Sequence, residues 1–151
     1  MRAPSGREFW LVSIHMPTLR AGFNRFLGGD VGGLKRHIDW WRHEMGRVVD
    51  GLTEIGDRPF LVGGDFNMPP DDATMAGLRS VCRFGFEEAG WGYGYTRPTR
   101  SPWFRIDHIL ASPQWAFTRC WVGPDLGSDH LPLLAEVSLP APPRPEGAPT
   151  P

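Results

Sequence analysis

The sequence predicts an α/β domain in which a strand, a long helix and a second strand are followed by a short helix and further strands. Three observations support this order: an apolar strand pattern near the start, one long amphipathic helical pattern, and several short apolar segments in the second half. This succession is typical of a layered α/β sandwich. The chain has 151 residues, of which 40% are hydrophobic and 22% charged, which fits one globular domain.

The first expected strand covers residues 9–15, and Pro17 ends it. Its apolar character predicts a largely buried, central strand with a neighbour on each side. No residues precede it that supply one of those neighbours. We therefore expect either that the chain is a piece of a longer protein or that another chain completes it.

The long helix is expected over residues 34–55, after a Gly-rich stretch (22–33) that is typical of a mobile loop. Gly56 and Pro59 end the helix. Apolar residues recur at steps of three and four, and Arg and His lie on the other face. The apolar residues are Leu34, Ile38, Trp41, Met45, Val48, Val49, Leu52 and Ile55.

The remaining elements are shorter. A strand at residues 60–64 leads to a short helix that begins after Pro69 and Pro70, and a turn-rich region follows at 85–103. Further strands are expected at 105–111, 117–122 and 133–139. From residue 140 onward six of the twelve residues are proline. We therefore expect a domain at 1–139 and a Pro-rich disordered tail at 140–151.

Composition excludes some classes of protein. The formal net charge of −1 argues against a protein that coats DNA by bulk attraction. The apolar runs are too short to span a bilayer, and charged residues interrupt any leader near the start, so we expect a soluble domain, in the cytoplasm by default. Cys82 and Cys120 match no metal or redox spacing and fit buried thiols equally well.

Polar side chains gather where the expected strands end, and loops converge at such ends in α/β sheets. Carboxylate and amide oxygens there suit Mg²⁺ or Mn²⁺ rather than zinc, and imidazoles can move protons or stabilise a charged phosphoryl group. The candidate residues are His15, Asp65, Asn67, Asp107, Asp129 and His130.

Each candidate also has a purely structural interpretation. Asp65 and Asn67 are suitable caps for the helix that follows them, and His15 alone is more often a core histidine. Asp107 is harder to explain structurally, because an unpaired charge between apolar strand residues is costly. The chemical interpretation therefore depends on the whole combination.

Three ordered motifs resemble those of the endonuclease/exonuclease/phosphatase superfamily: residues 64–67 (GDFN), 105–110 (RIDHIL) and 128–132 (SDHLP). Residues 12–15 (VSIH) resemble its strand that ends in an active-site histidine. The resemblance implies a four-layer α-β-β-α sandwich of the deoxyribonuclease I-like type. It covers only the C-terminal half of that fold. The earlier half, with an Asn and a metal-binding Glu, is missing.

The resemblance implies a divalent-metal-dependent phosphoester hydrolase, a nuclease or a phosphatase, that uses Mg²⁺ or Mn²⁺. Its substrate would be a nucleic acid, a phospholipid or a sugar phosphate. The alternative is a non-catalytic remnant of the fold that acts in binding or assembly. The resemblance implies a role for each residue. His15 contacts the scissile phosphate or assists the leaving oxygen, Asp65 orients or deprotonates the attacking water, and Asn67 holds that water or the phosphate. Asp107 binds metal or stabilises the site, Asp129 orients His130 or binds metal, and His130 stabilises the transition state. The implied metal ligands are Asp65, Asn67 and Asp129.

An aromatic and basic loop leads to Asp107. Such a loop can stack a base or a sugar and hold phosphates, or it can simply pack against the domain. The substrate-binding residues that we predict from it are Arg97, Arg100 and Trp103.

Overall fold

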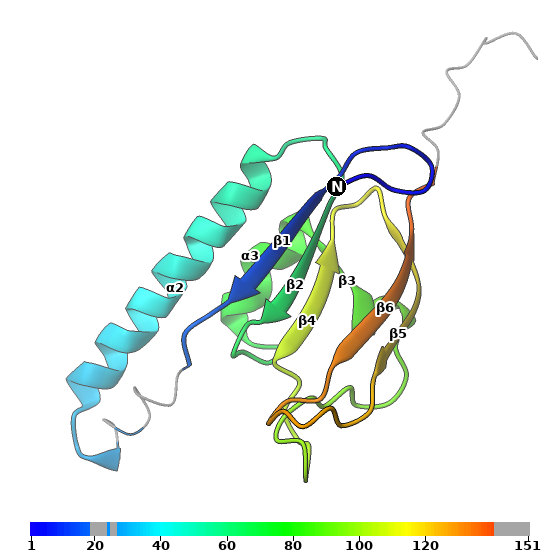
Figure 1. Ribbon diagram of the computed structural model, residues 1–151. Helices are drawn as coiled ribbons and strands as arrows, with labels where there is room; N and C mark the ends of the chain where they lie inside the picture. Colours follow the sequence, from blue (N-terminus) through cyan, green and yellow to red (C-terminus); the bar gives the residue numbers. More distant parts are fainter. Residues whose placement is uncertain (19–23, 25–26, 141–151) are drawn as a thin grey trace, which may run out of the picture.

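The structure, a computed structural model, describes residues 1–18, 24 and 27–140. Strands, α-helices and one 3-10 helix alternate along these residues (Figure 1). In chain order they are β1 (Trp10–His15), α2 (Val31–Glu54), β2 (Phe60–Asp65), η1 (Ala73–Met75), α3 (Ala76–Val81), β3 (Arg83–Phe84), α4 (Gly85–Ala89), β4 (Asp107–Ala111), β5 (Ala116–Val122) and β6 (Leu133–Ser138).

The described strands form two sheets. A four-stranded sheet has the order β1-β2-β4-β3, in which β2 is parallel to β1 and antiparallel to β4. A second sheet consists of the antiparallel pair β5 and β6, and β6 contacts β4 while α4 packs on β5. Helices α2 and α3 pack together over one face of the larger sheet (Figure 1). On the other face, toward the viewer, none of the described helices lies (Figure 1).

The core lies between α2, α3 and the larger sheet. Trp41 and Met45 of α2 are buried against Val62 of β2 and Leu110 of β4. The helix begins earlier than predicted, because the Asp30 side chain accepts a hydrogen bond from the Gly33 N–H at 2.7 Å and caps it. Two glycines assigned to the preceding loop thus belong to the first turn of the helix.

Two sequence predictions differ from the structure. The region 85–103 was predicted to be turn-rich. It begins with the five-residue helix α4, which is too short to show a helical period. Strand β1 was predicted to be largely buried and to lack one of its two neighbours within this chain. It lies at the edge of the described sheet, and it is less buried than predicted. Its inner residues Val12 and Ile14 pack on the core, whereas Trp10 and Leu11 are 49% and 56% exposed. A run of apolar residues does not by itself show which of its side chains are buried and which are exposed.

The predicted boundary at residue 139 and the tail remain predictions, because residues 141–151 lie outside the described part of the chain. Cys82 and Cys120 are buried free thiols. None of the described helices combines the length and apolar character that a membrane span requires.

The pairing of β1 with β2 depends on Gly64. Its φ is 152°, and a Cβ atom there would lie 1.8 Å from the carbonyl oxygen of Ile14. We expect Gly64→Ala to lower the free energy of unfolding by at least about 2 kcal/mol, because β1 must move away. Urea denaturation measures this loss. The matched control is Gly63→Ala, whose Cβ meets nothing within 4 Å and should change stability little. Equal effects of the two substitutions would contradict the close-approach argument.

Candidate active site

Three predicted residues lie in one row across three neighbouring strands. His15 of β1 pairs in register with Asp65 of β2, and Asp65 pairs with Asp107 of β4. Because side chains alternate along a strand, this row faces away from the core residues Val62 and Leu110. The strand register therefore brings one imidazole and two carboxylates together on the face that has no helix.

Asp65 is the centre of this row. Its Oδ1 accepts the backbone N–H of Asn67 at 2.7 Å, and its Oδ2 accepts the Asn67 side-chain amide at 3.0 Å. Asn67 adopts a positive φ of 51° and donates a further hydrogen bond to the Met16 carbonyl at 2.7 Å. The two side chains thus meet through a tight turn.

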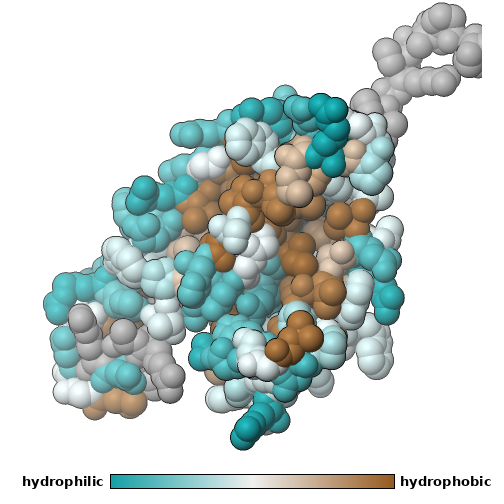
Figure 2. All heavy atoms as spheres, viewed as in Figure 1, coloured by the Kyte–Doolittle hydropathy of each residue, from teal (hydrophilic) through white to brown (hydrophobic). Residues whose placement is uncertain are grey.

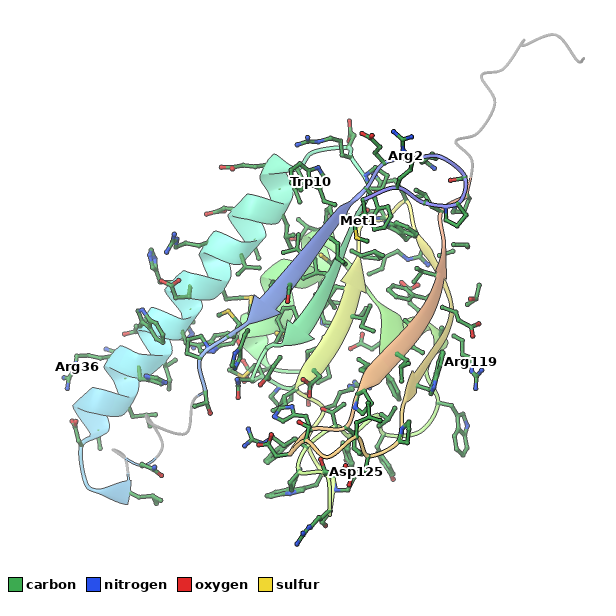
Figure 3. The ribbon with its side chains drawn as sticks, viewed as in Figure 1. Met1, Arg2, Trp10, Arg36, Arg119 and Asp125 are labelled. Atoms are coloured by element: carbon green, nitrogen blue, oxygen red, sulfur yellow. The ribbon has the colours of Figure 1, made fainter. Side chains whose placement is uncertain are left out.

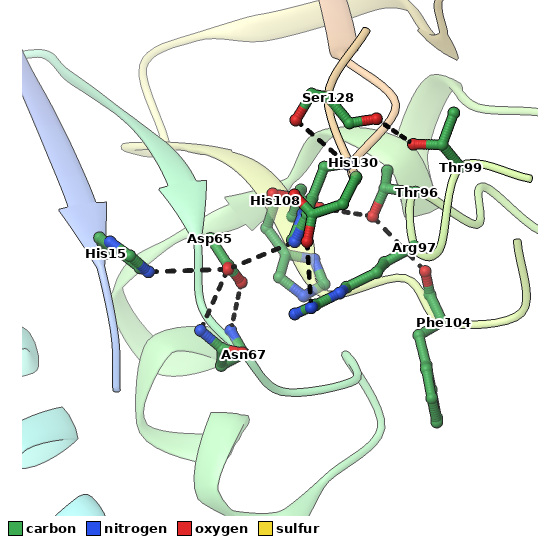
Figure 4. A network of polar contacts seen from close by, with 12 residues as sticks. His15, Asp65, Asn67, Thr96, Arg97, Thr99, Phe104, His108, Ser128 and His130 are labelled. Atoms are coloured by element: carbon green, nitrogen blue, oxygen red, sulfur yellow. Dashed lines mark hydrogen bonds and ion pairs between the residues drawn. The ribbon is translucent and has the colours of Figure 1, made fainter. Parts of the chain in front are cut away.

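A loop after β5 adds His130 to the row. Its Nδ1 lies 2.8 Å from Asp107 Oδ2, and its Nε2 lies 3.9 Å from Asp65 Oδ2 (Figure 4). The Nε2 of His15 is also 3.9 Å from Asp65 Oδ2. One carboxylate oxygen therefore faces two imidazoles, of which His15 is largely exposed and His130 is mostly covered.

The loop that precedes β4 holds the His130 loop in place. Arg97 donates to Asp129 Oδ2 at 3.1 Å, and Thr99 donates through its backbone N–H to the Asp129 carbonyl and through its hydroxyl to the Ser128 carbonyl. Thr96 donates to Asp107 at 2.5 Å. Segments about thirty residues apart are thereby joined at the site (Figure 4).

Burial raises the pKa of the Asp65 carboxyl above its usual value, and the nearby charge of Asp107 adds to the rise. The Asn67 backbone N–H and the two imidazoles act in the opposite direction. Asp65, Asp107 and His130 each offer one ligand atom, and these atoms lie within 4.8 Å of one another. This group is a possible site for a metal ion.

The structure thus brings five predicted residues into one contact network: His15, Asp65, Asn67, Asp107 and His130. Asp129 is bonded to Arg97 and is not a member of the possible metal group. The carboxylate that contacts His130 is Asp107. Capping does not explain Asp65, because Asp72 caps the helix that follows.

The predicted substrate-binding residues lie in the loop before β4. Arg97 contacts Asp129, Arg100 is exposed, and Trp103 is 61% exposed and stacks on Phe104 with ring centroids 4.2 Å apart. Sequence reasoning missed Thr96, because a single threonine in a turn-rich loop gives no signal. Only its hydrogen bond to Asp107 of β4 distinguishes Thr96 from the other residues of the loop.

His108 lies next to this row but belongs to the core. Its ring is buried between Phe66 and Phe84, and its Nε2 lies 2.9 Å from the Met68 carbonyl. Burial lowers the pKa of His108 to about 4, so the ring is neutral at pH 7 and donates its Nε2–H to that carbonyl. A groove of about 480 Å³ begins at Asp107 and His130 and continues along the uncovered sheet face, past Ile109 and Leu133.

Comparisons with known proteins concern the family and the fold of the chain. A family model described as the endonuclease/exonuclease/phosphatase family matches residues 6–130. A search of curated proteins gives no match. Among solved structures, the catalytic domain of human Nocturnin is similar, with 21% identity, a TM-score of 0.63, and coverage of 91% of this chain and 49% of that one.

Two further solved structures are similar. A mannosyl-6-phosphatase from Bacteroides thetaiotaomicron is 18% identical, with a TM-score of 0.58 and coverage of 89% of this chain and 52% of that one. A 3′ phosphatase from Neisseria, bound to a product DNA hairpin, is 21% identical, with a TM-score of 0.57 and coverage of 72% and 56%. At these identities the similarity concerns the fold. The chain spans about half the length of the solved chains that it matches.

The buried His108 makes stability depend on pH. Because its pKa is about 4 in the folded chain and ordinarily 6.5, the unfolded chain takes up the proton first as the pH falls. The contribution of the neutral His108 ring to the free energy of unfolding is fully present above about pH 6.5. It falls by about 3 kcal/mol as the pH is lowered toward 4. We expect His108→Gln to have a flatter pH dependence between pH 7 and pH 4 in urea unfolding. The exposed His43→Gln should keep the wild-type slope, and a wild-type slope in His108→Gln would contradict this assignment.

Proposed function

The chain belongs to the endonuclease/exonuclease/phosphatase family, and we propose that it carries the hydrolytic site of a divalent-metal-dependent phosphoester hydrolase. The observation that carries this proposal is the position of Asp65. Its Oδ2 lies 3.9 Å from the Nε2 atoms of both His15 and His130. A partly buried carboxylate between two imidazoles is suited to move protons and to stabilise charge around a phosphoryl group.

Each residue has a role that its position supports. Burial makes Asp65 a stronger base, so it would orient and deprotonate the attacking water while Asn67 holds that water or the phosphate. The exposed His15 would contact the scissile phosphate or assist the leaving oxygen. Asp107 would fix the ring of His130, and the protonated ring would stabilise the charge of the transition state through its Nε2–H.

The oxygen-rich donors fit Mg²⁺ or Mn²⁺, which prefer carboxylate and carbonyl oxygens. Asp65 and Asp107 supply two carboxylates within reach of one another, and their mutual repulsion would fall when a cation lies beside them. Asn67 and Asp129 are the further ligands that we propose from the sequence. A bound ion would neutralise charge on the phosphoryl oxygens.

The loop before β4 is the proposed substrate contact. Arg97 and Arg100 would hold phosphate groups, and Trp103 would stack on a ring of the substrate. An open cleft of about 560 Å³ supports the role proposed for Trp103, since aromatic side chains line much of it: Tyr93, Tyr95, Trp103 and Phe104. The substrate is a nucleic acid, a sugar phosphate or a phospholipid headgroup, all of which present a phosphoester.

We also propose that more of the fold than these residues is needed for full activity, supplied by another segment or by a second chain. Figure 2 shows hydrophobic residues gathered over the middle of the sheet face that carries no helix. The outer edge of β1 begins at the half-exposed Trp10 (Figure 3), in a groove of about 750 Å³ that Met1, Phe9 and Leu11 also line. An open edge and an apolar face of this kind are suited to receive further strands.

The alternative is a non-catalytic remnant that uses the fold for binding, which the uncovered apolar face also permits. Activity separates the two. We expect the 151-residue chain to hydrolyse bis-p-nitrophenyl phosphate with Mg²⁺ slowly, and a completed protein to hydrolyse it much faster. In the completed protein Asp65→Asn should lower kcat by at least about 10²-fold, because the proton acceptor is lost.

The control for that experiment is Asp39→Asn, an exposed carboxylate on α2 whose contact is with Arg42. It should leave kcat unchanged. A completed protein that shows no hydrolysis with Mg²⁺ or Mn²⁺, or an Asp65→Asn variant with wild-type kcat, would favour the remnant.

Trp103→Ala tests the substrate contact separately. Loss of one stacking surface should raise KM about tenfold for a phosphoester that carries a nucleobase and leave kcat nearly unchanged. Steady-state kinetics on 3′-phosphorylated nucleotides and on mannose 6-phosphate compare the two kinds of ring. The control Trp40→Ala, an exposed residue on α2, should have no effect. An unchanged KM for every substrate would show that this loop only packs on the domain.

A further inference from the structure

Thr96 is wholly buried in the loop before β4. Its Oγ1 lies 2.5 Å from Asp107 Oδ2 and 3.4 Å from the Phe104 carbonyl oxygen. A hydroxyl has one proton to donate. The carboxylate oxygen of Asp107 is both the nearer and the stronger acceptor of the two. The hydroxyl therefore donates to Asp107, on the same oxygen that lies 2.8 Å from Nδ1 of His130.

The backbone of Thr96 is held on both sides. Its N–H donates to the Phe104 carbonyl at 2.8 Å, and its own carbonyl accepts the Leu131 N–H at 2.7 Å. Leu131 directly follows His130 in the chain. One residue therefore fixes both members of the Asp107–His130 pair, the first through its side chain and the second through its main chain.

We infer that Thr96 is a positioning residue for the Asp107–His130 pair. With its hydroxyl on Asp107 Oδ2, that oxygen stays directed at Nδ1, so neutral His130 keeps its proton on Nδ1 and presents an unprotonated Nε2 toward Asp65. Without the hydroxyl the carboxylate can rotate and the proton can occupy either ring nitrogen. The expected effect of Thr96 on the rate of hydrolysis rests on the proposed function, whereas its effect on the tautomer of His130 does not.

The first test is the ¹⁵N NMR signature of the His130 ring in the full chain, at a pH where the ring is neutral, because it distinguishes the two tautomers without any substrate. We expect the Nδ1–H tautomer alone in the wild type and in Thr96→Ser, and a mixture in Thr96→Val, which preserves volume but lacks the hydroxyl. Thr118→Val is the control. It removes an exposed hydroxyl of β5 that is bonded to the Glu136 carbonyl and should keep the single tautomer.

The second test is kinetic and uses bis-p-nitrophenyl phosphate with Mg²⁺. Thr96→Val should lower kcat at least about tenfold with KM within about twofold, and Thr96→Ser should restore kcat. A single tautomer in folded Thr96→Val would overturn the inference. A mixture of tautomers in Thr96→Ser would also overturn the inference. The Thr96→Ser variant therefore decides the case if Thr96→Val does not fold. A wild type that shows the expected tautomers but no hydrolysis would contradict the proposed function and leave the positioning role supported.

Discussion

The register of β1, β2 and β4 is the constraint on which the candidate site depends. Successive side chains of a strand point to opposite faces, so a shift of one residue would turn His15 or Asp65 toward the helices and expose its apolar neighbours. Val12, Val62 and Leu110 are paired in register and pack in the core. The burial that stabilises the sheet therefore also determines which face carries the polar row.

Much of the fold could be predicted from sequence, and the family match confirms the predicted superfamily. The apolar period of α2 predicted its buried face, including Trp41, because a long amphipathic helix repeats its pattern over many turns. Helix α4 has five residues and no such repeat, so its sequence was indistinguishable from turns. The burial of β1 was overestimated because Trp10 and Leu11 are apolar but half-exposed, and the composition of a strand does not show what covers it.

The residues of the candidate site could be named from the sequence, but the contacts among them could not. Strand ends predicted that His15, Asp65 and Asp107 would come together, since the register follows from the alternation of buried residues. The partner of His130 could not be predicted in the same way. It depends on how two loops meet, and the hydrogen bonds of Thr96 and Arg97 that join them involve residues about thirty positions apart.

The electrostatics of Asp65 connect this geometry to its proposed chemistry. Burial and the neighbouring charge of Asp107 both oppose ionisation of Asp65, so an empty site keeps two carboxylates in an unfavourable arrangement. The Asn67 N–H groups and two imidazoles offset this only in part, since His15 is exposed to solvent and His130 is shared with Asp107. Positive charge brought to this row, by a cation or by protonation of the imidazoles, relieves both effects. An anionic phosphoester is attracted to the row only once that charge is present, so we expect binding of the cation to favour binding of the substrate.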